Sequence, residues 1–217
     1  MRMIDGPRLP PASGGPAKKL VVFLHGYGAD GNDLIDLGRM FAQIAPDAAF
    51  VSPNASDPCD QSPMGRQWFP LAMGDPHLYW RGVEHAAPAL NAFLDAELEG
   101  LGLSNRDLAL VGFSQGTMMA LHVGLRRKDG IAGIVGYSGL VAGPEHLADA
   151  DVHKVPVLLV HGDADPIIPV MALHASVQAL GAAGILTEWH VSKGLAHGID
   201  EAGLRLGADF LHRVLAG

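Results

Sequence analysis

The sequence is poor in cysteine, in charged side chains and in long apolar runs, and each shortage excludes a class of protein. Its 217 residues include one cysteine, Cys59, so no internal disulfide can form and nothing points to an oxidising compartment. No run reaches the ~18 apolar residues of a membrane span. The segment 1–16 lacks the apolar centre of a secretory signal. We therefore expect a cytoplasmic protein without stable membrane insertion.

The charge balance is acidic and excludes a second group of functions. Lysine and arginine number 15 against 23 acidic residues, which gives a formal net charge of −8. Nucleic acids and anionic membranes attract basic surfaces, so we expect neither as a general partner. Hydrophobic residues make up 48% of the chain, as in a soluble globular protein with a sizeable core.

Apolar runs and helical spacing alternate along the chain after an N-terminal arm, residues 1–17, whose many Pro and Gly residues predict little order. Such alternation predicts an α/β fold with a mainly parallel sheet and helices on both faces. We expect one domain, residues 1–217, because no repeat or composition break divides it. Strands are predicted at 20–24, 48–52, 108–111, 131–135, 155–160 and 185–191, and helices at 32–45, 84–100, 115–128, 170–181 and 199–215.

The segment 53–83 carries several Pro and Gly residues and four aromatic side chains, and no regular element is predicted in it. A long irregular segment inside a compact domain is more often functional than a linker. We therefore expect residues 53–83 to contribute to the site.

A candidate nucleophile lies in the pattern Gly112-Phe113-Ser114-Gln115-Gly116. An apolar strand is predicted before it and a helix after it, which is the strand–turn–helix context of a nucleophile elbow. The glycines allow close backbone packing while the serine hydroxyl points out above the sheet. The alternative is a serine that only caps a helix between chance glycines.

A serine hydroxyl needs a general base, and the base needs an acid that orients it. The predicted strand 155–160 leads into a loop with two candidate acids, Asp163 and Asp165. We favour Asp165, which lies further along the loop before a proline, and we expect Asp163 to brace the turn. His197 follows the last predicted strand and precedes the last helix, so it is the predicted base. His161 precedes the acid loop and is expected to brace it.

The loop after the first strong strand, His25 to Gly31, is rich in glycine and fits the dinucleotide pattern G-x-G-x-x-G. A dinucleotide site needs an acid at the tip of the next strand, and that strand ends in Ser52-Pro53-Asn54. The loop serves better as an oxyanion hole, in which backbone N–H groups stabilise a tetrahedral intermediate. We predict the N–H groups of Tyr27 and Gln115 as the two donors and a structural role for His25.

The motifs around His25, Ser114, Tyr137-Ser138-Gly139, Asp165 and His197 occur in an order that resembles the phospholipase/carboxylesterase family, which includes bacterial carboxylesterases and acyl-protein thioesterases. The resemblance implies an α/β-hydrolase fold without a cap domain that cleaves carboxylic esters or thioesters with no cofactor and no metal. It places the catalytic triad on Ser114, Asp165 and His197, and the oxyanion donors on Tyr27 and Gln115.

Two further expectations concern the substrate pocket. Trp68 and Phe69 lie in a segment that looks like the loop beside the family's acyl pocket, so the resemblance implies acyl-chain contacts for them; plain core aromatics are the alternative. Tyr27 is bulkier than the leucine often found at this position in the family. The backbone role of Tyr27 is unaffected by its size, but the family's pocket shape does not carry over to this chain.

The function that we expect is a serine carboxylesterase that forms an acyl-enzyme intermediate with a small-molecule ester. One alternative is a thioesterase or lysophospholipase acting on long acyl chains. The other is a non-catalytic ligand-binding module on a hydrolase scaffold. A homodimer is compatible with the sequence.

Overall fold

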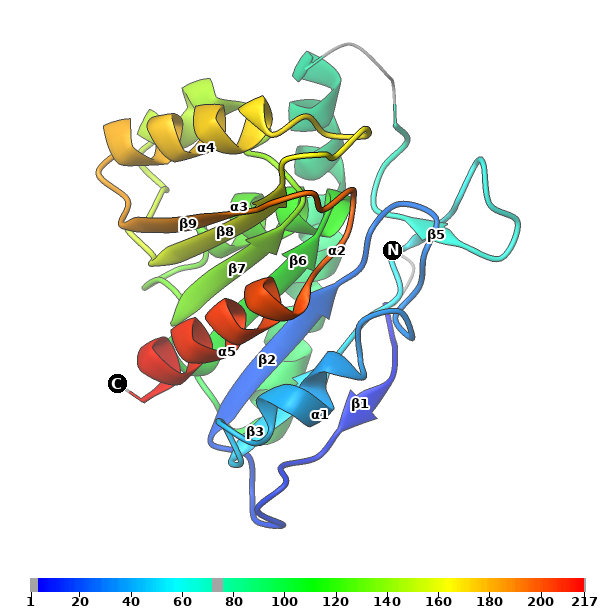
Figure 1. Ribbon diagram of the computed structural model, residues 1–217. Coiled ribbons are helices and arrows are strands. Elements are labelled where there is room, and N and C mark those ends of the chain that lie inside the picture. The colour runs from blue at the N-terminus through cyan, green and yellow to red at the C-terminus, as the bar shows by residue number, and fades with distance from the viewer. Residues whose placement is uncertain (1–3, 72–75, 217) are drawn as a thin grey trace.

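The computed structural model describes residues 4–71 and 76–216. Its main sheet has the strand order β1-β3-β2-β6-β7-β8-β9, with β1 antiparallel to β3 and every other neighbouring pair parallel (Figure 1). The strands are β1 (Arg8–Leu9), β2 (Lys19–Leu24), β3 (Ala48–Val51), β6 (Leu108–Phe113), β7 (Gly133–Tyr137), β8 (Val157–Gly162) and β9 (Thr187–Ser192). A separate short hairpin pairs β4 (Asp57–Pro58) with β5 (Arg66–Gln67).

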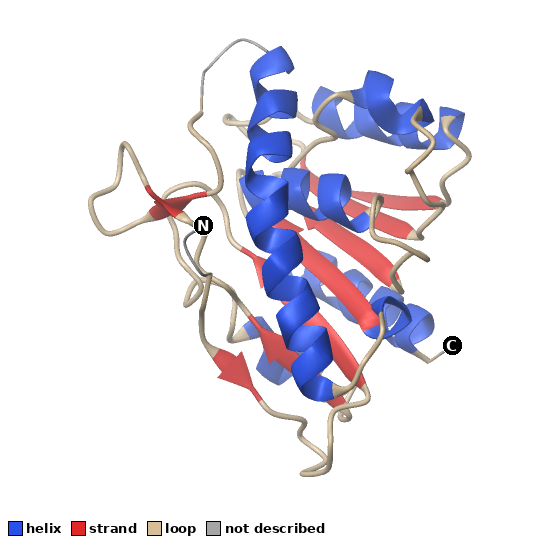
Figure 2. Ribbon diagram, turned by 180° about the vertical axis from the view of Figure 1, so that it is seen from behind, coloured by secondary structure: helices blue, strands red, loops and turns tan. Residues whose placement is uncertain are grey.

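Helices cover both faces of this sheet. Figure 2 shows the long helix α2 and the shorter α3 across one face, and Figure 1 shows α1 and α5 across the other. The helices are α1 (Leu37–Phe41), α2 (Pro76–Leu101), α3 (Gln115–Gly124), α4 (Met171–Ala182) and α5 (Glu201–Leu215), with 3-10 turns η1 (Asn105–Asp107) and η2 (Pro144–Ala148). The predicted α/β fold with a mainly parallel sheet is confirmed.

The alternation of side chains along β2 explains the two-layer core. Val22 and Leu24 belong to the apolar cluster under α2 and α3, whereas Val21 and Phe23 belong to the cluster under α1 and α5. Successive side chains of a strand point to opposite faces, so a strand buried on both faces is apolar throughout. This explains why the run Leu20 to Leu24 has no polar residue.

Most predicted elements are observed with ends shifted by at most four residues, but the helix predicted at 32–45 is wrong in extent. Only α1 is helical, and tight turns flank it. The N–H groups of Leu37 and Gly38 donate to the carbonyls of Leu34 and Ile35, three residues back rather than four. Consecutive tight turns repeat about every three residues, so they bury the apolar side chains that a continuous helix would bury.

The second correction concerns α2, which begins eight residues earlier than the predicted residue 84. Pro76 is its first residue, where the missing N–H of proline costs no hydrogen bond. Trp80 and Val83, assigned above to the irregular segment, therefore lie on a helix and pack against the core. Pro88 lies inside the helix.

The N-terminal arm is more ordered than predicted. Arg8 and Leu9 pair with Val51 and Phe50 as the antiparallel edge strand β1. The Arg8 guanidinium also binds Glu97 of α2, with Nη2 to Oε1 at 2.5 Å. Backbone pairing at a sheet edge needs no periodic side-chain pattern, so composition alone gave no sign of it.

The chain reverses its direction of travel across the sheet between β2 and β6. From β2 it moves outward to β3, and α2 then returns it to the other side of β2, where β6 begins. Loops from neighbouring strands diverge at such a switch point and leave a crevice beyond the carboxyl ends of the strands. The loops that follow β2 and β6 carry Tyr27 and Ser114. No helix within 4–71 or 76–216 combines the length and the apolar character needed to cross a bilayer.

Candidate active site

Ser114 occupies a strained turn between β6 and α3. Its φ is 54° and its ψ is −115°, a conformation that side-chain-bearing residues rarely adopt and that clusters at functional sites. The Ser114 N–H donates to the Tyr137 carbonyl at 2.9 Å. A Cβ on Gly116 would overlap the Leu24 carbonyl of β2. The glycine thus permits the close approach of helix and strand that the sharp turn requires.

Asp165 and His197 meet at the carboxyl edge of the sheet. Oδ2 of Asp165 lies 2.7 Å from Nδ1 of His197, and Oδ1 accepts the N–H groups of Ile167 and Ile168 at 2.8 and 2.9 Å. The Asp165 side chain is completely buried, whereas His197 is 18% exposed. A fixed carboxylate therefore orients a partly accessible imidazole.

The hydrogen bonds around Asp165 decide its charge. Burial disfavours the charged form, but the hydrogen bonds from His197, Ile168 and Ile167 outweigh it and hold the pKa of Asp165 below its ordinary value. The carboxylate is thus ionised at neutral pH and can stabilise a positive charge on His197. Such a charge arises when a histidine accepts a proton from a nucleophile.

Asp163 and His161 bind the loops around this pair. The exposed Asp163 accepts the N–H of Gly194 through Oδ1, which ties the acid loop to the turn before His197. The buried His161 lies with Nε2 2.8 Å from the Ile168 carbonyl and 3.3 Å from Oδ2 of Asp165. Both residues lie where their predicted bracing roles require.

The His197 ring lies beside the nucleophile turn, since its centroid is 5.0 Å from that of Phe113, the residue before Ser114. Among the described residues no hydrogen bond joins the Ser114 hydroxyl to His197. Catalytic hydrogen bonds often shorten only when substrate binds.

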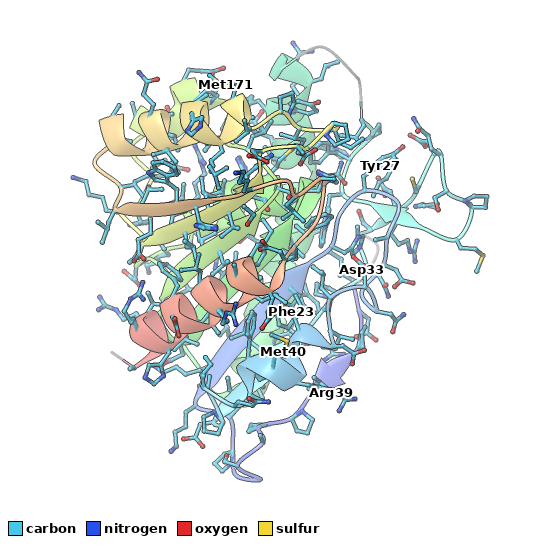
Figure 3. All side chains as sticks on the ribbon, viewed as in Figure 1. Phe23, Tyr27, Asp33, Arg39, Met40 and Met171 are labelled. Carbon is cyan, nitrogen blue, oxygen red and sulfur yellow. The ribbon has the colours of Figure 1, made fainter. Side chains whose placement is uncertain are left out.

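The two predicted oxyanion donors come from neighbouring loops. Within the described part of the chain, neither the Tyr27 N–H nor the Gln115 N–H donates a hydrogen bond. The Gly26 backbone lies against the elbow, because a Cβ there would be 3.4 Å from that of Ser114. Figure 3 shows Tyr27 on the loop beyond the carboxyl end of β2. Both N–H groups are thus available near the serine.

His25 holds the peptide that carries the Tyr27 N–H. Nε2 of His25 accepts the Ala55 N–H at 3.0 Å, so Nδ1 carries the proton and donates to the Gly26 carbonyl at 2.7 Å. Burial lowers the pKa of His25 and keeps the ring neutral. The Gly26 carbonyl and the Tyr27 N–H share one planar peptide unit, so fixing the first orients the second.

The Tyr27 phenol points to the hairpin of β4 and β5. Burial and the neighbouring Cys59 thiol raise the pKa of Tyr27 to about 12. The Gly28 N–H also donates to the Arg66 carbonyl at 2.9 Å. The loop that carries Tyr27 is thus fastened to the hairpin by a backbone hydrogen bond of the next residue.

Trp68 and Phe69 lie in the core and are each 1% exposed. They line none of the described cavities. Nε1 of Trp68 donates to the His25 carbonyl at 3.0 Å. Both rings are covered in this structure, and acyl-chain contacts for them stay a prediction. The alternative of core aromatics fits both residues.

An apolar cavity of about 210 Å³ borders the loop that follows β7. Gly139 packs against the Ser114 carbonyl, and the chain continues from it directly into the cavity wall. The wall is formed by Tyr79, Leu140, Val141, Ala142, Gly143, Pro144, Ala172, Ala175 and Ser176. These wall residues belong to α2, α4 and the loop after β7. The sequence patterns gave no sign that these three segments lie together.

Ser138 is a structural residue of the site for which the sequence predicted no role. It has a φ of 47°, and its Oγ donates to the Gly198 carbonyl at 2.9 Å. Gly198 follows His197, so this bond anchors the histidine loop to β7. The motif Tyr137-Ser138-Gly139 marked the position, but the strained φ has no sequence signal.

The strand order, the strained serine turn and the position of the site at the switch point define an α/β-hydrolase. The profile of the Phospholipase/Carboxylesterase family matches residues 11–215. The chain therefore belongs to this family, which confirms the predicted resemblance and the class of enzyme, a hydrolase of carboxylic esters.

Three relatives illustrate the similarity. Esterase YpfH of Escherichia coli is 29% identical over 198 residues, covering 90% of this chain and 83% of that protein. Acyl-protein thioesterase 1 of Saccharomyces cerevisiae is 28% identical over 197 residues, covering 84% and 86%. The crystal structure of esterase PE8 superposes with a TM-score of 0.94 at 43% identity, covering 98% of this chain and all of that one.

Proposed function

We propose that the protein is a serine carboxylesterase with Ser114 as nucleophile, His197 as general base and Asp165 as the acid that orients it. The observation that carries the proposal is the 2.7 Å contact between Asp165 and His197 beside the strained turn of Ser114. A pure ligand-binding module has no need of a buried, ionised carboxylate aimed at a histidine.

The reaction proceeds in two acyl transfers. Oγ of Ser114 attacks the ester carbonyl carbon while its proton passes to His197, and the carbonyl oxygen becomes an oxyanion. The N–H groups of Tyr27 and Gln115 stabilise that charge. The C–O bond to the alcohol breaks as His197 returns the proton to the leaving oxygen. Water then attacks the acyl-enzyme by the same steps and releases the acid.

The apolar cavity beside Gly139 is the proposed seat of the acyl chain. Its wall is almost entirely aliphatic, with Tyr79 at one side, and suits a hydrocarbon. Ile167 and Met171 are apolar side chains that are 64% and 67% exposed; Met171 lies at the start of α4, directly before the cavity residue Ala172 (Figure 3). These two exposed side chains favour the second candidate, a thioesterase or lysophospholipase for long acyl chains, which the similarity to acyl-protein thioesterase 1 also supports.

A fluorophosphonate probe tests the nucleophile. The wild type should be labelled at Ser114 and should hydrolyse p-nitrophenyl esters. Ser114→Ala should not be labelled and should lose about 10⁴–10⁶-fold in kcat. Absence of wild-type labelling would instead favour the ligand-binding module.

A series of oxygen and thio esters with increasing acyl length separates the two enzyme candidates. Each methylene that enters the cavity should raise kcat/KM about fourfold, from about 0.8 kcal/mol per buried CH₂. A series of oxygen esters that stops improving once the cavity is filled supports the carboxylesterase. Continued improvement with long-chain thioesters supports the thioesterase.

A further inference from the structure

The two oxyanion donors belong to different loops, and their relative position has to be fixed to within a fraction of an ångström. Tyr27 follows β2 and Gln115 begins α3 after β6. Preorganised donors stabilise a developing charge because they need no rearrangement during the reaction. A misplacement of 1 Å can cost about 10²-fold in rate. The bonds that join the two loops therefore bear on catalysis.

Trp68 bridges these loops through two separate hydrogen bonds. Its indole N–H donates to the carbonyl of His25, two residues before Tyr27, at 3.0 Å. Its backbone N–H donates to Oε1 of the Gln115 side chain at 2.9 Å. The ring is 1% exposed and packs 5.5 Å from the His25 ring between centroids. Both hydrogen bonds are therefore shielded from water.

The Gln115 side chain makes its end of the bridge rigid. Besides accepting from Trp68, its Nε2 donates to the Phe69 carbonyl at 2.7 Å. Both ends of the amide are bound, so its orientation is determined. Gln115 itself is 1% exposed. The backbone of Gln115 supplies one proposed oxyanion N–H. Its side chain binds the backbone of Trp68 and Phe69, and the Trp68 indole in turn binds the His25 loop, which carries the other donor.

We propose that the Gln115 side chain and the Trp68 indole are positioning residues that set the spacing of the two oxyanion donors. This inference rests on the proposed function. It gives Trp68 a role in the reaction that requires burial, and it gives Gln115 two roles in one residue, a catalytic N–H and a positioning side chain.

Two variants break the bridge at different places. Gln115→Met keeps the length of the side chain and the backbone N–H but removes both amide hydrogen bonds. Trp68→Phe keeps a buried ring and the backbone bond to Gln115 but removes the indole donor. Because each acts on one end, the proposal can be tested even where one variant folds poorly.

Gln67→Met is the matched control. Gln67 is buried and immediately precedes Trp68, and its amide makes two hydrogen bonds, both to Asp60 at 3.2 Å. These bonds lie within the hairpin of β4 and β5 and touch neither Gln115 nor the His25 loop. The control therefore removes an equal number of amide hydrogen bonds without cutting the bridge.

Three quantities are measured: kcat and KM for a p-nitrophenyl ester, inhibition by a trifluoromethyl ketone, and the thermal unfolding temperature. The ketone is informative because addition of Ser114 to it forms an oxyanion. Active-site titration with a fluorophosphonate sets the enzyme concentration. Gln115→Met and Trp68→Phe should lose about 10–100-fold in kcat, with KM within about threefold. Their affinity for the ketone should fall by the same factor as kcat/KM.

Gln67→Met should lower the unfolding temperature while kcat and ketone affinity stay within about threefold of wild type. The proposal is overturned if the Gln115 and Trp68 variants lose stability as the control does but keep kcat and ketone affinity. Absence of fluorophosphonate labelling in the wild type would overturn the proposed function and this inference together, so the two failures are distinguishable.

Discussion

The two carboxylates of the acid loop differ in what their oxygens bind. Both oxygens of Asp165 are used: Oδ1 accepts two backbone N–H groups and Oδ2 faces Nδ1 of His197. Asp163 is exposed, and its Oδ1 accepts one N–H, that of Gly194. The Asp165 carboxylate therefore fixes the His197 tautomer with its proton on Nδ1, whereas the Asp163 carboxylate only closes a turn.

This difference predicts unequal effects of two isosteric changes. In Asp165→Asn the carbonyl oxygen would stay with the N–H groups of Ile167 and Ile168, so the amide NH₂ would face His197. The histidine proton would then move to Nε2, where it cannot accept the serine proton, and kcat should fall about 10⁴-fold. Asp163→Asn keeps its acceptor and should stay within about fivefold. Steady-state kinetics with an unfolding curve for each variant provide the measurement, and a reversed ranking would make Asp163 the acid.

Sequence patterns predict the candidate catalytic residues but not the hydrogen bonds that hold them in place. Ser114, Asp165 and His197 are predicted as candidates because each follows a predicted strand, and loops after parallel strands meet at one edge. The bond from Ser138 to Gly198 and the bridge through Trp68 could not be found this way. They depend on a strained φ and on side chains far apart in sequence, and neither leaves a periodic signal.

At the scale of elements, α4 forms one wall of the apolar cavity through Ala172, Ala175 and Ser176. Small residues on this face leave the space that a substrate chain would occupy. The hydrophobic spacing of the helix was readable from the sequence. The sequence did not show which face of α4 borders a cavity, because the opposite wall of the cavity comes from α2 and the loop after β7.

Ala175→Phe should fill part of the cavity and shorten the acyl chain that the enzyme accepts. Ala175 is exposed, so the larger ring enters without disturbing the core. Esters whose chains fill the wild-type cavity should lose about 10-fold or more in kcat/KM, whereas an acetyl ester should stay within about twofold. A rate series over acyl length provides the measurement.

Ala182→Phe is the control for this substitution, since Ala182 is also exposed on α4 but does not line the cavity. It should leave the acyl-length profile unchanged. An equal change in both variants, or none in Ala175→Phe, would move the acyl site elsewhere.

The predicted secondary structure agrees well with the structure for strands that are buried on both faces of the sheet. It agrees poorly for segments whose backbone hydrogen bonds form turns or an edge strand. The runs Leu20 to Leu24 and Leu108 to Val111 are apolar throughout, and the strands that contain them, β2 and β6, were predicted within two residues of their ends. The turns around α1 satisfy the same apolar spacing without a continuous helix, and β1 gains its order from pairing with β3. Tertiary contacts, rather than propensity, decide such segments.

At the scale of the whole molecule, parallel topology assembles the site from distant parts of the chain. The loops after β2, β6, β8 and β9 supply Tyr27, Ser114, Asp165 and His197, which span most of the sequence. A change that loosens the sheet therefore weakens every part of the site at once. The pH dependence of folding stability is such a global property, and buried neutral histidines control part of it.

His122 of α3 should make the fold less stable in mild acid. Burial lowers its pKa to about 4, and the nearby positive charge of Arg126 acts in the same direction. Nδ1 of His122 has no hydrogen-bond partner among the described residues, so nothing compensates a charge there. Between about pH 6.5 and pH 4 the unfolded chain binds a proton at this residue that the folded chain does not.

The free energy of unfolding should therefore fall as the pH is lowered through that window, and His122 should account for about 2 kcal/mol of the loss between pH 7.5 and pH 5. His122→Phe keeps a ring beside Trp80, whose ring lies 5.0 Å away, but cannot take up the proton. Denaturant unfolding at both pH values should show a smaller loss in the variant by that amount. Equal losses in the two proteins would mean that His122 accepts a proton in the folded state as readily as in the unfolded chain.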